Sequence, residues 1–232
     1  MTFQPLTLLQ GQYLDWLLRG METTVKLFGF CLISGFILAL ILTALRLSNS
    51  RFLQAVVAIY VEYHRNVPAL VQLLLWYFGI SSALPLLMSD WINQHSSEFL
   101  FAYIALTLNA AAFMSEDLRS GVRAISAGQM EACRAMGLTF TQSMRDVILP
   151  QAVRVSIPPL ISQALALFKS TSLAMAISVT ELTYAAKEID NETFRTFESY
   201  AIVSVIYLIG SAVIVGLGMT YEHINSRRGG VR

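Results

Sequence analysis

Long apolar runs alternate with short polar segments along this chain of 232 residues. A bilayer core takes about 20 apolar residues as a helix, and lipid offers no partners for a free backbone. The pattern predicts an all-α integral membrane protein with five spans in a single domain, over about residues 21–46, 53–79, 98–120, 152–178 and 198–222. Pro158 and Pro159 predict a kink or a delayed start of the fourth span. Leu84 to Leu87 is too short to cross and indicates an outer loop or short helix.

The distribution of arginine predicts the orientation, because positive loops stay inside. Arginines gather after the first, third and fifth spans, and they are Arg46, Arg51, Arg119, Arg123, Arg134, Arg145, Arg154, Arg227, Arg228 and Arg232. The connection after the second span has no lysine or arginine, and the one after the fourth is acidic on balance. We therefore expect the N-terminus outside, and the C-terminus and the central loop (residues 121–150) inside the cell.

Composition narrows the chemistry further. Only 13% of residues are charged, where soluble domains carry about a quarter, and the mean hydropathy is +0.58. A net charge of +1 gives no bulk attraction to nucleic acid. Neither Cys31 nor Cys133 has a neighbour at zinc-site spacing, and no GxxxxGK[ST] phosphate loop occurs. We therefore expect no metal, no bound cofactor and no catalytic residue in this chain.

The central loop has the local signals of two short helices. Ser126 and Thr139 each precede a glutamine by three residues, which is the spacing of a capping box. Gly137 lies where a left-handed helix cap would fall, and Pro150 would set the entry into the fourth span. Methionines and small residues beside a few charges fit either a groove on a partner protein or the lipid headgroups. These residues alone leave both interpretations open.

A gapped pattern runs through the central loop, from Glu131-Ala-Cys through Gly137 to Val147-Ile-Leu-Pro150, with three and nine residues between its parts. It resembles the cytoplasmic EAA loop of bacterial ABC-importer permeases, in which Glu-Ala-Ala, three residues, glycine, nine residues and Ile-x-Leu-Pro follow one another. Cys133 replaces the family's alanine at the third position and Val147 its isoleucine, and both changes keep a small or apolar side chain.

Other segments are similar to the polar amino acid branch of that family, which handles histidine, glutamine, glutamate, arginine and opines. They are Arg65–Gln72, Ala111–Gly121 leading to Gly128-Gln129, and Lys169–Leu173 followed by Glu181-Leu182. The resemblance implies a multi-pass permease of the bacterial inner membrane with a periplasmic N-terminus and a cytoplasmic C-terminus. It also implies a second permease, identical or homologous, a dimer of ATP-binding subunits that holds ATP and Mg, and a periplasmic amino-acid-binding protein.

The resemblance further implies that residues 128–136 form a coupling helix seated in a cleft of the ATPase. The residues implied in this coupling are Gly128, Glu131, Ala132, Arg134, Gly137, Leu149 and Pro150. Glu131 is expected to make a charge-assisted contact with the ATPase. Its alternative is a local ion pair with Arg134 or Arg145.

Polar side chains inside the predicted spans form a second candidate set, for the translocation path. They are Glu62, Arg65, Asn109, Glu116 and Lys169. A charge at mid-bilayer costs at least about 2.5 kcal/mol, so such groups face a bundle interior or a watery cavity. Arg65 and Lys169 would meet an anionic group of a substrate. The alternative is that the charged members form ion pairs that fix helix packing.

The sequence thus predicts a non-catalytic permease that imports a polar amino acid, and the fragment Arg65–Pro68 favours glutamate or aspartate. The alternative is an ion-coupled secondary transporter without an ATPase. The odd number of spans, the missing inverted repeat and the EAA-type loop argue against it. An intramembrane enzyme would need more than the one suggestive pair, His64 near Glu62.

Overall fold

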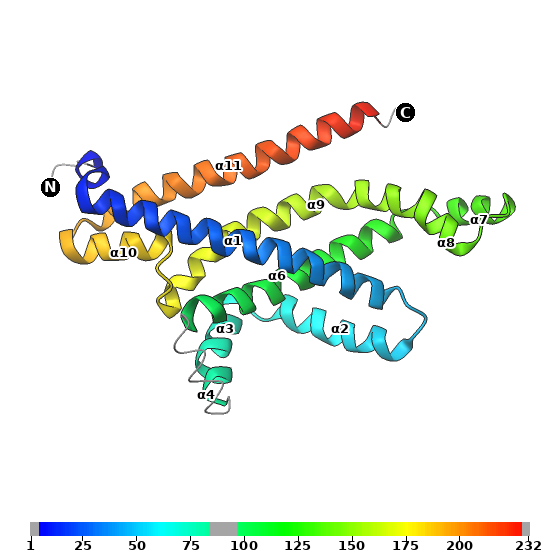
Figure 1. The fold of residues 1–232 in the computed structure, drawn as a ribbon, viewed down its shortest axis with the longest axis horizontal. Coiled ribbons are helices and arrows are strands. Elements are labelled where there is room, and N and C mark those ends of the chain that lie inside the picture. Colours follow the sequence, from blue (N-terminus) through cyan, green and yellow to red (C-terminus); the bar gives the residue numbers. More distant parts are fainter. Residues whose placement is uncertain (1–4, 84–96, 229–232) are drawn as a thin grey trace.

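The computed structural model describes residues 5–83 and 97–228, and these residues form helices joined by short connections, without strands (Figure 1). Four helical segments are long and apolar enough to cross a membrane, and a bent pair makes a fifth if it counts as one span. The expected all-α membrane fold is confirmed. The four segments are α1 (Gly11–Arg46), α6 (Ser97–Arg123), the continuous helix Phe140–Ile177 and the part Thr196–Tyr221 of α11 (Thr196–Arg228).

Shorter elements connect these helices. The continuous helix consists of α8 (Phe140–Ser143), the π-helical turn η3 (Met144–Ile148), α9 (Leu149–Ser170) and the 3₁₀ segment η4 (Thr171–Ile177). The others are η1 (Pro5–Leu9), α2 (Arg51–Asn66), α3 (Ala69–Leu74), the π-helical η2 (Leu75–Ile80), α4 (Ser81–Ala83), α7 (Ala127–Ala135) and α10 (Leu182–Thr193). The segment Leu84 to Leu87, expected as an outer loop or short helix, lies outside the described residues.

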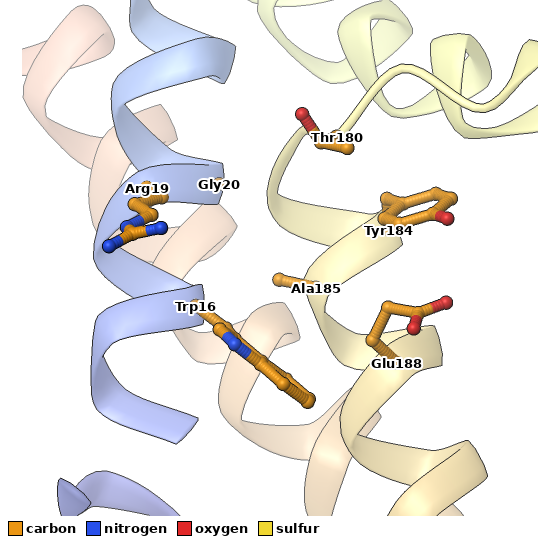
Figure 2. A pocket seen from close by; sticks show the side chains of 7 residues that line it. All are labelled: Trp16, Arg19, Gly20, Thr180, Tyr184, Ala185 and Glu188. Carbon is orange, nitrogen blue, oxygen red and sulfur yellow. The ribbon is translucent and has the colours of Figure 1, made fainter. Parts of the chain in front are cut away.

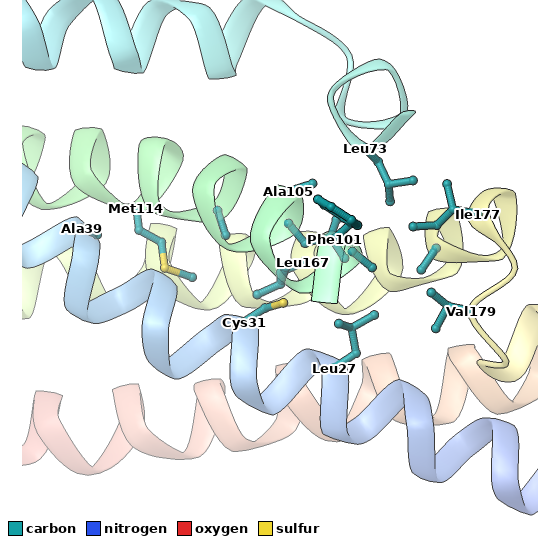
Figure 3. Packing of buried hydrophobic residues seen from close by; sticks show 14 of the residues in the cluster. Leu27, Cys31, Ala39, Leu73, Phe101, Ala105, Met114, Leu167, Ile177 and Val179 are labelled. Carbon is teal, nitrogen blue, oxygen red and sulfur yellow. The ribbon is translucent and has the colours of Figure 1, made fainter. Parts of the chain in front are cut away.

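Small side chains place α6 at the centre of the bundle. Half of its most apolar stretch is buried, against 11% for α11. At Gly35 of α1, an added Cβ would lie 3.5 Å from the carbonyl oxygen of Thr107, so the two backbones approach closely. Leu27 of α1, Phe101 of α6 and neighbouring apolar side chains fill the space between the helices (Figure 3). The exposed apolar side of α11 suits contact with lipid.

The second predicted span is not one helix. α2 and the helical residues 69–83 meet at an angle of 108°, where one helix was expected over 53–79. Pro68 is the cause, because its ring disfavours a helical backbone at the preceding residue and it has no N–H to donate. Val67 is accordingly extended, with φ −94° and ψ 130°.

The fourth span also differs from one expectation. Pro158 and Pro159 lie inside α9, which runs from Leu149 to Ser170 without a new start at the prolines. Pro150 is in the first turn of α9, as predicted, directly after the π-helical turn η3 of the same continuous helix. The expected delay of the helix is therefore wrong, because α9 has already begun nine residues before the first of the two prolines.

The buried residue Glu181 contacts three helices, with its carboxylate or its backbone, at the end of the molecule that holds the N-terminus (Figure 1). Glu181 accepts hydrogen bonds from the backbone N–H groups of Thr183 and Tyr184, both at 2.9 Å, and so caps α10. The hydroxyl of Tyr207 in α11 donates to the same carboxylate at 2.8 Å. Burial raises the pKa of the Glu181 carboxyl, and these hydrogen bonds act in the opposite direction. On α1, Gly20 leaves room for the Glu181 carbonyl oxygen, 3.0 Å from where a Cβ would stand.

Candidate functional site

The central loop presents α7 at the end of the molecule opposite the N-terminus (Figure 1). Ser126 caps α7 by accepting a hydrogen bond at 3.3 Å from the backbone N–H two residues on. The side chain of Gln129 makes no recorded bond back to it, so this capping box forms only in half. At α8 the predicted box is complete, because Thr139 and Gln142 each accept from the other's backbone N–H. Local hydrogen bonds therefore start both short helices.

Gly137 ends α7 as predicted. Its φ of 79° lies in the left-handed region, which glycine enters without a Cβ penalty. Its N–H donates to the carbonyl of Arg134 at 2.9 Å, and the N–H of Leu138 donates to that of Cys133 at 3.0 Å. This pair of bonds is the Schellman motif, which satisfies the last carbonyls of a helix and turns the chain sharply.

All seven residues implied in coupling are exposed, and they are Gly128, Glu131, Ala132, Arg134, Gly137, Leu149 and Pro150. Within the part of the chain that the structure describes, Glu131 forms no ion pair; Arg145 lies 3.9 Å from Asp146 instead. Cys133 on the other side of α7 is buried. The helix thus offers a free carboxylate to the outside, beside the exposed apolar side chains of Met136 and Phe140.

Side-chain amides satisfy the backbone carbonyls at the break between α2 and α3. The buried side chain of Gln72 donates to the carbonyls of His64 at 2.9 Å and Val67 at 2.7 Å. Asn109 of α6 donates to the same His64 carbonyl at 3.0 Å. A helix end inside a membrane leaves carbonyls that lipid cannot satisfy, so these two amides are what allows the break.

A cleft of about 430 Å³ opens beside this break, and we call it the membrane cleft. Two of the expected path residues, Arg65 and Asn109, line it together with Gln163 and Ser170 of α9. The Arg65 guanidinium carbon lies 5.6 Å from the ring centroid of Phe113, a cation–π distance. Arg65 forms no ion pair with any described residue, but its charge also acts on the nearby Glu116 and Asp117 carboxylates of α6.

The other three expected path residues do not line the membrane cleft. Glu62 accepts a hydrogen bond from Asn66 at 2.9 Å. Glu116 pairs with Arg119 of its own helix at 2.6 Å. Lys169 is exposed, and its ammonium has no recorded partner among residues 5–83 and 97–228. Among the described residues of one subunit, the charged path residues therefore form no ion pair that connects two different spans.

Sequence reasoning missed Gln72 as the residue that closes the break, and Gln163 and Ser170 as residues of the membrane cleft. The one signal for the break was Pro68, which stands between two apolar stretches and forbids a regular helix through residue 67. Gln163 and Ser170 lie on an apolar helix at positions that only the packing of α9 against α6 selects. No group of three or more metal-ligating side chains is placed to share an ion in the described residues.

A second cleft, the outer cleft, lies between α1 and α10 and has a volume of about 330 Å³ (Figure 2). Gly20 and Ala185 lie where the two helices face each other, and Trp16 and Tyr184 add aromatic surface. Arg19 and Glu188 stand on opposite helices (Figure 2).

Comparison with known proteins covers nearly the whole chain. Residues 33–227 match the family model described as binding-protein-dependent transport system inner membrane component. A probable amino-acid ABC transporter permease of Vibrio harveyi, PatM, is 37% identical over 84% of this chain and 85% of its own. The nopaline transport permease NocM of Agrobacterium fabrum is 34% identical over 92% and 91%. The glutamate/aspartate import permease GltJ of Escherichia coli is 31% identical over 88% and 84%.

A solved structure gives the same picture of the fold. A chain of a crystal structure titled as an amino acid ABC transporter with histidines superposes with a TM-score of 0.85 at 29% identity. The alignment covers 96% of this chain and 99% of the other.

Proposed function

This chain belongs to the family of binding-protein-dependent transport system inner membrane components, and from this premise we propose that it forms the membrane pathway of an importer for a polar amino acid. It is a non-catalytic ABC transporter permease of the inner membrane, so the energy comes from ATP hydrolysis in a partner subunit. The match from residue 33 to 227 carries the proposal, because it runs from within α1 to near the end of α11 and includes the complete central loop. The relatives that share this length are permeases for amino acids or opines.

The coupling role is proposed for α7. An ATPase dimer holding ATP and Mg would bind α7 on its exposed side, with Glu131 as the charged contact and Arg134 beside it. Gly137 would give the sharp turn, and Leu149 and Pro150 would begin the helix that carries the movement inward. The free carboxylate of Glu131 supports this assignment over a local pair, because neither Arg134 nor Arg145 is bonded to it within the described residues.

The orientation follows from the same assignment. If α7 meets the ATPase, the C-terminus is cytoplasmic and the N-terminus periplasmic, since η1 and α10 lie at the far end of the molecule (Figure 1). A periplasmic amino-acid-binding protein would then meet the end that holds α10 and the outer cleft. Labelling of single cysteines at Gln12 and Gln129 in intact cells tests this: only Gln12→Cys should react with a membrane-impermeant maleimide.

The membrane cleft is proposed to bind substrate during passage. Arg65 would hold a carboxylate, and the amides of Asn109 and Gln163 would hydrogen-bond the remaining polar groups. Glutamate or aspartate, each with two carboxylates, fits a cleft with an unpaired cation, and the glutamate/aspartate permease among the relatives supports this choice. Lys169, Glu62 and Glu116 stay candidates for parts of the path that a second permease, identical or homologous, would complete.

Reconstitution tests the proposal directly. Vesicles with the permease, its ATPase and its binding protein should import the amino acid that the binding protein binds, only when ATP is present. Thermal-shift screening of that binding protein against amino acids identifies the substrate. Import that stops when a protonophore and a sodium ionophore are added, and that needs no ATPase, would instead establish the ion-coupled secondary transporter.

A further inference from the structure

α6 and α9 approach each other closely where α6 has a glycine in place of a side chain, and we call this point the inner crossing. Gly121 of α6 is buried there against Ala152 and Ser156 of α9. A Cβ added at Gly121 would overlap the Ser156 hydroxyl and would lie 2.8 Å from the Ala152 carbonyl oxygen. The Ser156 hydroxyl itself is 2.9 Å from the Ala152 carbonyl and 3.3 Å from that of Asp117.

A side-chain rotation does not make room at the inner crossing. Turning Ser156 moves its hydroxyl away, but its Cβ stays 3.2 Å from the added atom and the Ala152 carbonyl belongs to the backbone. Any side chain at residue 121 therefore pushes the two helices apart. Packed interiors respond to such an insertion by moving whole elements, because no free volume is there to absorb it.

The inner crossing stands at the base of the central loop. Gly121 lies two residues before Arg123, where α6 ends, and Ser156 lies seven residues after Leu149, where α9 begins. The two helices and α7 between them thus form a hairpin that is closed at its base. A force on α7 reaches both helices together while this base is closed.

The packing on the side of α1 is looser. Thr43 of α1 donates a hydrogen bond to the Ser115 carbonyl of α6 at 3.1 Å. Beyond this bond, towards the loop, an apolar cavity of about 300 Å³ separates Ala44 of α1 from Ala152 and Ser156 of α9. Within the hairpin, α6 and α9 are therefore closely packed, whereas free space remains between the hairpin and α1.

We propose that the inner crossing is the positioning element that makes the inner ends of α6 and α9 and the central loop move as one unit against α1. Gly121 acts through α7 and touches neither ATP nor substrate. The inference rests on the proposed function, and it names where the movement of the ATPase enters the membrane helices. Without the crossing, the loop would move while the spans stayed in place.

The test uses the complete transporter, with ATPase and binding protein, in vesicles. It measures ATP hydrolysed and amino acid imported for the wild type, for Gly121→Ala and for the double variant Gly121→Ala/Ser156→Gly. Gly121→Ala should keep its ATPase rate while import falls about tenfold, a size typical of disturbed coupling networks. The double variant removes the Ser156 side chain and should regain part of the import. Gly216→Ala on α11, where an added Cβ meets nothing within 4 Å, is the matched control and should match the wild type.

The single variant Ser156→Gly covers the case in which Gly121→Ala fails to assemble. It inserts no atom, yet it loosens the crossing, and it should raise the ATP used per amino acid imported. An unchanged ratio in either single variant that assembles overturns the inference. A parallel loss of hydrolysis and import without rescue in the double variant also overturns it. Failure of the wild type to import with ATP would instead contradict the proposed function.

Discussion

The central loop and the membrane cleft are built in opposite ways. In the loop, each functional feature comes from neighbours in the chain, such as Gly137 with the carbonyls just before it. At the break beside the cleft, the Gln72 amide of α3 and the Asn109 amide of α6 meet at the His64 carbonyl of α2. The loop is exposed and shares few atoms with the bundle, whereas these amides are buried or half-buried. Changes in the loop should therefore alter coupling, and changes at the amides that close the break should alter stability and transport together.

The largest effect is expected from Glu131→Arg. Reversing this exposed charge places like charges at the proposed contact with the ATPase, which costs several kcal/mol and should lower ATP-driven import by about 100-fold. The thermal stability of the isolated permease should not change, because Glu131 has no ion-pair partner among the described residues. Import, ATPase binding and melting temperature are the measurements.

Glu188→Arg at the outer cleft is the control for this charge reversal, since it changes the charge equally at the far end of the molecule. It should leave ATPase binding intact. If Glu131→Arg binds the ATPase and imports normally, the coupling assignment is wrong.

The next largest effect is expected from Gln72→Leu. This change leaves the Val67 carbonyl unsatisfied and weakens the pairing of His64, at a cost of about 1–3 kcal/mol for a buried group. Both the melting temperature in detergent and the import rate should fall. Gln163 lines the membrane cleft, and its side chain donates to no backbone carbonyl among the described residues. Gln163→Leu should therefore lower import without lowering the melting temperature. Equal melting temperatures for all three proteins would show that the amides do not hold the break.

Gly137→Ala should have a smaller effect. A Cβ meets nothing within 4 Å there, so the cost is the left-handed backbone alone, about 1–2 kcal/mol for an L-residue. We expect a loss of helix order in α7 and a several-fold loss of coupling, seen by hydrogen exchange and by import. Gly128→Ala stands on the same helix without a positive φ, and it should leave α7 as stable or more so. If Gly128→Ala lowered the helix order of α7 more than Gly137→Ala did, the role of the Schellman motif would be contradicted.

Lys169→Gln should have the smallest effect on stability. Its ammonium is exposed and lacks a recorded partner in the described chain, so removing the charge breaks no contact there. The melting temperature should stay the same. If Lys169 lines the path at the second permease, KM for import should rise, though by less than in Arg65→Gln, whose charge lies in the membrane cleft. A lower melting temperature would instead reveal a structural role.

The sequence by itself determined four of the five helical spans, the caps of α8 and the turn at Gly137, because each depends on apolar length or on hydrogen bonds between residues a few positions apart. It also contained Pro68, which forbids a straight second span.

Only the tertiary structure decided where the chain turns after that proline, which amides close the break and which polar groups share a cleft. It also decided that Arg65 lies near Phe113 and that Gly121 has no room for a side chain. The reason is physical: these contacts join helices far apart in sequence, and their geometry depends on how small residues let the helices approach. The local sequence shows which polar groups need a hydrogen-bond partner, and the packing of the helices determines which partner each group meets.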